Sequence, residues 1–185
     1  SYIAVSEHGL SEDELLAVLG VQNRSFDWHL FFCAFNNHFV TRNGLITFSH
    51  HYISDAVITR YQLNDKKQSC IYRKEIIKVF SSLYGNEKKR CAYELGYQYY
   101  SMEEYEQLYQ LLMSFRSFNY YYETDFYRNK LARYWKALMT NNYHIDDYLN
   151  LPIETGKDIP YLEMGMFAQS FFAAYNISLA YYRIA

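Results

Sequence analysis

A ten-residue segment centred on Asn43-Gly44 limits the possible folds more than any other part of the sequence. Residues 39–42 and 45–48, on either side of this pair, are rich in β-branched and aromatic side chains. Asn-Gly suits a two-residue turn in which both residues adopt positive φ, so the segment predicts a tight β-hairpin. Elsewhere the apolar residues recur at helical spacing. We therefore predict a mainly α-helical chain with one small hairpin.

Two helices are expected before the hairpin. The motif S-E-D-E that begins at Ser11 is a capping box, in which the Ser11 and Glu14 side chains each accept a backbone amide of the other residue. This helix should end at Gly20. A second helix is predicted over residues 26–37, opened by Ser25. It is apolar on almost every side, so we expect it to be deeply buried.

A third helix is expected directly after the hairpin, with Ser49 as its cap. Its apolar positions recur at helical spacing: Tyr52, Ile53, Ala56, Val57 and Tyr61. The order helix, helix, hairpin, helix predicts a winged-helix-like domain over residues 1–64. The polar run at residues 64–68 supplies the boundary.

Residues 65–185 are predicted to form a helical region that leads towards repeats. The expected helices cover residues 70–83, 87–100, 102–114, 115–122, 125–139, 145–149 and 164–184. Short breaks between amphipathic helices favour antiparallel hairpins stacked in sequence, as in a solenoid. No repeat of fixed length is present, so the sequence does not predict a regular tetratricopeptide array.

Composition argues against nucleic acid and membrane as partners. The formal net charge is −2 and the 22 tyrosines are interleaved mainly with Glu, Gln and Asn. A surface that stacks single-stranded nucleic acid needs basic residues between its aromatics. We read the tyrosines instead as helix-packing residues with an apolar body and a polar tip. The apolar stretches are too short to cross a bilayer.

The ends and the cysteines indicate a cytoplasmic segment. The first residues lack the features of a signal peptide, which suits a piece of a longer protein. Cys33, Cys70 and Cys91 have no C-x-x-C spacing and lie in apolar or helical contexts. We expect them to be small buried side chains in a reducing compartment.

No short catalytic signature is found in the sequence. It contains no P-loop, no G-x-G-x-x-G, no G-x-S-x-G and no H-E-x-x-H. Cys33 lies four residues after His29, as in a nucleophilic pair, but in an apolar stripe we expect a protonated, inert thiol. His8, His38 and His144 lack metal-ligand spacing. We predict a chain that is not an enzyme and holds no metal or cofactor of its own.

His50-His51 is the only adjacent histidine pair and is expected in the first turn of the third helix. The amides at a helix N-terminus favour an anion and disfavour a protonated imidazole. A neutral His50 at this place is therefore suited to donate a hydrogen bond to a phosphate. The alternative is that both histidines only face solvent or pack.

Two other classes of protein share the predicted outline. In a DNA-binding winged helix, residues 26–33 would enter the major groove, yet they offer neither base-reading groups nor phosphate-binding cations. The hairpin turn carries only Arg42. The other alternative is a free-standing helical scaffold that binds a protein through Tyr-rich grooves.

Several blocks in order resemble the region that follows the ATPase core in NACHT-type STAND proteins, in the nephrocystin and telomerase-associated protein branch. The first blocks are GLSEDELL at residues 9–16, GLITFSHHYISDAV at residues 44–57, and Arg60-Tyr61. RCAYEL at residues 90–95, Leu108 to Leu112, Phe118 and LARYW at residues 131–135 resemble the helical region that follows the winged helix in those proteins. The resemblance spans about residues 9 to 139.

This resemblance implies a regulatory role in signal transduction, in a class whose relatives act in defence. In such ATPases an upstream P-loop domain holds ADP or ATP, and a winged-helix histidine contacts the diphosphate in the closed, inactive state. That role falls to His50, in a Phe48-Ser49-His50 sequence that resembles the family's Phe-x-His. The implied partners are the upstream NACHT domain, the downstream repeats of the same polypeptide and other proteins. The P-loop and effector domains are not within this sequence.

Overall fold

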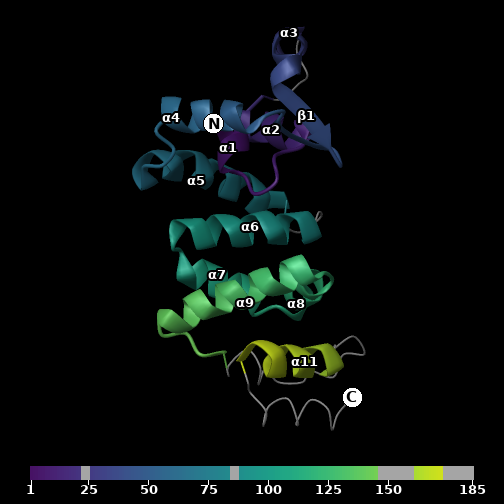
Figure 1. Ribbon diagram of the computed structural model, residues 1–185, viewed down its shortest axis with the longest axis vertical. Helices are drawn as coiled ribbons and strands as arrows, with labels where there is room; N and C mark the ends of the chain where they lie inside the picture. Colours follow the sequence, from purple (N-terminus) through teal and green to yellow (C-terminus); the bar gives the residue numbers. More distant parts are fainter. Residues whose placement is uncertain (22–25, 84–87, 146–160, 173–185) are drawn as a thin grey trace. The chain divides into compact units, whose positions relative to one another are not determined.

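The computed structural model describes residues 1–21, 26–83, 88–145 and 161–172 (Figure 1). Over these residues the chain is mainly helical with one small antiparallel hairpin, which confirms the predicted fold class. The chain divides into two compact units, Ser1–Glu103 and Glu104–Ala185. Among the described residues, no helix has both the length and the apolar character that crossing a membrane requires.

Unit 1 contains the hairpin and the helices around it. Its elements are α1 (Tyr2–Val5), α2 (Glu12–Leu19), α3 (Phe26–Phe35), the 3-10 turn η1 (Asn36–His38), β1 (Phe39–Arg42), β2 (Leu45–Phe48), α4 (His51–Arg60), α5 (Lys66–Leu83) and α6 (Lys88–Met102). Leu10 adds a single antiparallel bridge to Ile46. Along the chain, α1 is followed by this bridge, by α2 and α3, and then by the hairpin.

The hairpin forms as predicted. Its strands pair antiparallel from Phe39 opposite Phe48 to Arg42 opposite Leu45. Asn43 and Gly44 have φ values of 51° and 79°, as a tight turn with two left-handed residues requires. Gly9 lies against the hairpin with φ of 92°, and a Cβ atom built there would stand 2.3 Å from the Ile46 carbonyl oxygen. Only glycine allows this approach.

The capping box of α2 is also confirmed. The Glu14 amide donates to the Ser11 hydroxyl over 3.2 Å, and the Ser11 amide donates to the Glu14 carboxylate over 2.8 Å. Gly20 ends the helix in the left-handed conformation. Leu15 and Leu16 are buried.

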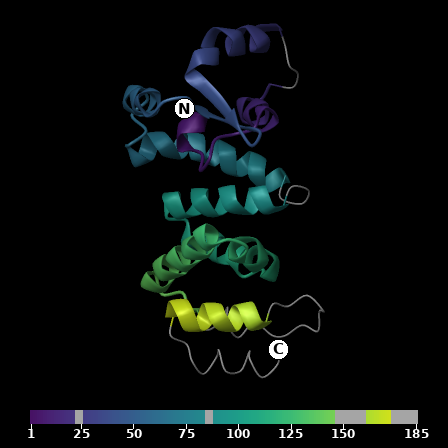
Figure 2. The ribbon, with the colours of Figure 1, turned by 45° about the vertical axis from the view of Figure 1, so that its right-hand side comes forward.

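The predicted burial of the second helix is wrong. Trp28 is buried, and its indole nitrogen donates to Glu12 Oε1 over 2.8 Å, but Leu30, Phe31 and Phe35 are each more than 40% exposed. In Figures 1 and 2, α3 lies at the end of unit 1 far from α6. A helix that is apolar on all sides has more apolar surface than the few elements near it can cover.

The helices α5 and α6 run side by side and complete unit 1 (Figure 2). The polar run expected as a break supplies the start of α5, because the Asp65 carboxylate accepts the Lys67 amide over 2.8 Å. Contacts of α5 with α1 and α2 tie it to the hairpin-bearing part. The boundary predicted between residues 64 and 65 therefore lies inside one compact unit.

A polar network joins α6 to the segment 5–9. Arg90, Glu94 and Gln98 follow one another at four-residue intervals and so lie on one face of α6. Glu94 is fully buried and accepts the Arg90 guanidinium over 2.8 Å, the Gln98 amide over 2.6 Å and the Glu7 backbone amide over 3.3 Å.

Carbonyl oxygens of the same segment accept the other donors of this network. Arg90 donates to the Gly9 carbonyl over 2.8 Å, and Gln98 donates to the Val5 carbonyl over 2.9 Å. From α5, Arg73 donates to the Val5 carbonyl over 3.1 Å and to Gln98 over 2.7 Å. With Glu94, four side chains thus hold the backbone of residues 5–9 against the α5–α6 hairpin.

Unit 2 contains α7 (Tyr105–Leu112), α8 (Phe115–Tyr122), α9 (Asp125–Thr140) and α11 (Tyr161–Phe172). Its core is made of fully buried apolar side chains: Leu108, Leu112, Phe118, Tyr121, Leu131, Trp135, Leu138 and Phe167. Tyr121 and Tyr134 meet edge to face with ring centroids 5.9 Å apart, the packing role expected of the tyrosines. Most of the helix predicted at 145–149, and residues 173–184 of the last one, lie outside the described residues.

Candidate functional site

His50 occupies the N-cap of α4, with an extended backbone at φ −139° and ψ 147°. Ser49 was expected to cap this helix, and that prediction is wrong. The Ser49 hydroxyl instead donates to the Asn37 carbonyl over 2.9 Å, and its amide donates to the His38 carbonyl. Both acceptors lie in η1, directly before β1. Because the Ser49 hydroxyl donates to one of them, it does not cap α4.

The His50 side chain is exposed and stacks on one neighbour. Its ring lies 5.3 Å from that of Tyr52, with 10° between the planes. The stacking places the imidazole against the Tyr52 ring at the surface. The imidazole remains open to contact from outside the unit.

His51 has a different environment from His50. Its Nδ1 lies 2.7 Å from Asp55 Oδ2, one helical turn along α4, and both side chains are exposed. The carboxylate orients this imidazole by accepting or sharing a hydrogen bond at Nδ1. The two adjacent histidines are therefore chemically distinct, and His50 is the one without a carboxylate at its ring.

The start of α4 is suited to an anion. The first amides of a helix have no acceptor within the helix and carry the positive end of its dipole. In α4 these include the amides of His51 and Tyr52, whereas the Ile53 amide donates to the His50 carbonyl over 3.1 Å. With the His50 ring, this helix start offers hydrogen-bond donors for an oxyanion but no nucleophile.

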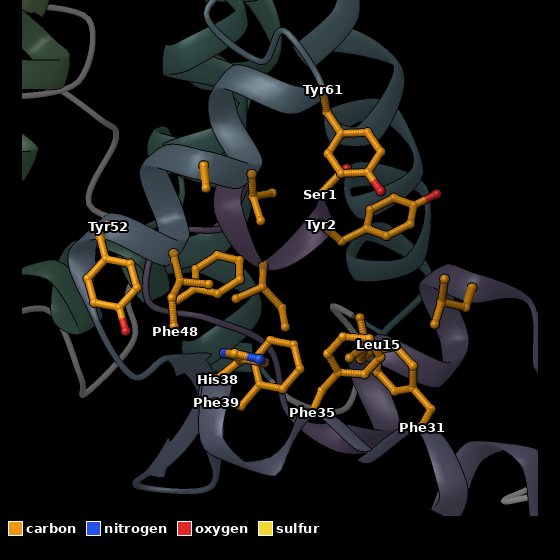
Figure 3. A pocket seen from close by; sticks show the side chains of 15 residues that line it. Ser1, Tyr2, Leu15, Phe31, Phe35, His38, Phe39, Phe48, Tyr52 and Tyr61 are labelled. Carbon is orange, nitrogen blue, oxygen red and sulfur yellow. The ribbon is translucent and has the colours of Figure 1, made fainter. Parts of the chain in front are cut away.

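An apolar pocket of about 470 Å³ opens beside α4 (Figure 3). Its lining comes from α1, α2, α3, the hairpin and α4: Ser1, Tyr2, Ile3, Leu15, Leu19, Phe31, Phe35, His38, Phe39, Phe48, Tyr52, Ile53, Ala56, Val57 and Tyr61. Figure 3 shows Tyr2 and Tyr61 along one edge and Phe31 and Phe35 along the opposite one. Volume and lining are those of a site for an apolar group.

Tyr52 connects the pocket with His50, since it lines the pocket and stacks on the His50 ring. The polar side chains in its lining belong to Ser1, to His38 and to its three tyrosines. Burial, together with the nearby Glu75 carboxylate, raises the pKa of Tyr2 above its ordinary value. The Tyr2 hydroxyl therefore stays protonated at neutral pH.

The predicted burial of Cys33 is wrong as well. Cys33 is exposed, Cys70 is half-buried and Cys91 is buried, and all three are free thiols. The thiol of Cys33 lies 3.6 Å from the Nε2 atom of His29, which is also exposed. The four-residue spacing brought the two groups together as expected, but outside the core.

The remaining histidines lie apart from one another. His8 lies 3.7 Å from Glu7, His38 lines the pocket, and His144 is exposed in unit 2. Within the part of the chain that the structure describes, no group of three or more His, Cys, Asp or Glu side chains could hold a metal ion.

The pocket had not been predicted from sequence. Its lining residues are scattered over the first 61 positions, and each suits an ordinary core position. The one available signal was the uniformly apolar character of residues 26–37, which the neighbouring elements could not cover.

Comparison of this chain with protein-family models, curated proteins and solved structures finds no match.

Proposed function

We propose that this chain is a non-catalytic regulatory segment of a NACHT-like signalling ATPase, in which the winged-helix-like part responds to a nucleotide held by a neighbouring domain. His50 is the residue that meets the phosphate. The helical region carries the response towards downstream repeats. In this scheme the nucleotide, ADP or ATP, belongs to the neighbouring domain and not to this chain.

The observation that carries the proposal is the exposed His50 ring at the N-cap of α4. A phosphate contact requires an imidazole that another domain can reach and an anion-tolerant surface around it. The ring is exposed, it stacks on Tyr52, and it stands beside the first amides of a ten-residue helix. The sequence resemblance assigns the phosphate contact to the same residue.

The mechanism is a shift between two conformations of the parent protein. A hydrogen bond from His50 to a bound diphosphate favours the closed arrangement, and its loss favours the open one. A hydrogen bond to a charged group contributes about 1.5–3 kcal/mol. One such contact therefore changes the closed-to-open ratio by about tenfold to a hundredfold.

The test uses the parent protein with His50→Ala. Nucleotide retention is measured by chromatography of the nucleotide released from purified, denatured protein, and ADP release is followed in a chase with unlabelled ADP. We expect ADP release to be about tenfold faster or more. His51→Ala is the matched control because its ring is held by Asp55. Unchanged ADP release and unchanged basal signalling in His50→Ala would contradict the role.

A second candidate function is a helical scaffold that binds a protein through the aromatic pocket. The observation in its favour is the group of exposed rings at the rim, among them Tyr52, Tyr61 and Phe35. Exposed apolar patches of this kind mark interaction sites. The two functions are separated by the coding sequence upstream of Ser1, because the first requires a P-loop there and the second does not.

A further inference from the structure

Cys33 and His29 form a thiol–imidazole pair on the exposed surface of α3. The Cys33 Sγ atom lies 3.6 Å from His29 Nε2, within hydrogen-bond distance for sulfur. Both residues are exposed, so a reagent in solution can reach them. Cys33 lies two residues from both Phe31 and Phe35, which line the pocket, so helical geometry places it on the opposite side of α3.

This arrangement supplies what a reactive cysteine needs. The thiolate is the nucleophile in cysteine chemistry, and an unassisted thiol is mostly protonated at neutral pH. His29 Nε2 can accept the thiol proton and leave a thiolate beside an imidazolium. Cys70 is half-buried and Cys91 is buried, so the same chain contains two internal references of lower accessibility.

We propose that Cys33 is a modification site that undergoes thiol–disulfide exchange with small disulfides, with His29 as the base. The Cys33 thiolate attacks one sulfur of the disulfide, and the new S–S bond forms as the old one breaks. The departing small thiolate takes the proton from the His29 imidazolium. Each event leaves one mixed disulfide on Cys33 and releases one small thiol, with no other oxidant. The proposal is independent of the nucleotide role of His50.

The first measurement compares the folded chain with the unfolded chain. Iodoacetamide is added at neutral pH, and mass spectrometry of peptides gives the alkylation rate of each cysteine with and without urea. We expect Cys33 in the folded chain to react about five- to tenfold faster than in urea. An exposed Cys33 thiol that His29 does not activate would be alkylated in the folded chain no faster than in urea. That result would overturn the proposal.

The second measurement assigns the effect to His29. In His29→Gln, the alkylation rate of Cys33 should fall to the value in urea, while the rate of Cys70 stays unchanged. His144→Gln, an exposed histidine in unit 2, is the control and should change neither rate. With oxidised glutathione as the disulfide, the Cys33 mixed disulfide should form several times faster in the wild type than in His29→Gln.

Equal Cys33 rates in the wild type and in His29→Gln, with helix content by circular dichroism also equal, would refute the assignment. If the His29→Gln protein loses helix content, the proposal can still be refuted. The comparison of folded with unfolded wild-type chain needs no variant and decides it alone.

Discussion

The fully buried Glu94 is the residue of unit 1 whose replacement should be most informative. In Glu94→Ala the Arg90 guanidinium, the Gln98 amide and the Glu7 backbone amide all lose an acceptor. Arg90 keeps the Gly9 carbonyl and Gln98 keeps the Val5 carbonyl, whereas the Glu7 amide loses both carboxylate oxygens that accept its proton.

The expected loss of unfolding free energy follows from these contacts. Losing a hydrogen bond to a charged group costs about 1.5–3 kcal/mol, and removing one partner of a buried ion pair costs about 3–5 kcal/mol. Since Arg90 is partly exposed and retains other acceptors, the lower part of that range applies, and we expect a loss of about 3 kcal/mol.

Two measurements check this loss. Urea unfolding monitored by circular dichroism should show a lower midpoint, and amide hydrogen exchange should speed up at Glu7 by about tenfold or more. Glu75→Ala is the control because Glu75 is an exposed residue of α5 whose contact with Lys78 is 4.0 Å long. Its effect should stay within about 0.5 kcal/mol. A Glu94→Ala protein no less stable than this control would refute the role of the network.

The same residue predicts a pH dependence. Burial raises the pKa of Glu94 above 4.5, against the opposing effects of Arg90 and Gln98. The folded state therefore holds this proton at pH values where the unfolded chain has released it. The contribution of Glu94 to stability then falls as pH rises from 4.5 through its folded pKa. Relative to Glu94→Gln, the wild type should lose unfolding free energy over that window. A difference that is constant with pH would contradict the shift.

Two further predictions concern the hairpin and the absence of catalysis. Gly9→Ala should lower the unfolding free energy by about 2 kcal/mol or more, because the new Cβ would meet the Ile46 carbonyl oxygen and because φ at Gly9 is positive. The loss is measured by urea unfolding. Gly20→Ala is the control, since Gly20 also has a positive φ but has open space where the Cβ would lie. The purified chain should show no ATP hydrolysis above buffer in a phosphate-release assay. Turnover that survives repurification would contradict the assignment of catalysis to another domain.

Features defined by neighbouring residues were predictable from the sequence. Asn43-Gly44 and the Ser11–Glu14 capping box act within a few positions of the chain, and both formed as expected. The predicted cap at Ser49 was wrong because a tertiary acceptor, the Asn37 carbonyl, competed for its hydroxyl.

Features that combine residues far apart in the sequence show no periodic pattern in it. The uniformly apolar sequence of α3 indicates no preferred side, so its burial depends on how much surface its neighbours offer. The pocket combines side chains from five parts of unit 1, and the Glu94 network joins residues 87 positions apart. Of the candidate site, the position of His50 at the start of a helix followed from the sequence, and the adjoining pocket did not.

The network on α6 recognises main-chain groups of the segment 5–9: the Val5 and Gly9 carbonyls and the Glu7 amide. Main-chain groups are common to all residue types except for the amide missing in proline. In homologues that keep these contacts, positions 90, 94 and 98 should therefore change together or not at all, whereas the contacts themselves require no particular side chain at positions 6 to 8. A lineage that replaces Glu94 should also replace Arg90. The loss of one without the other would indicate a chain in which α6 no longer binds the segment 5–9.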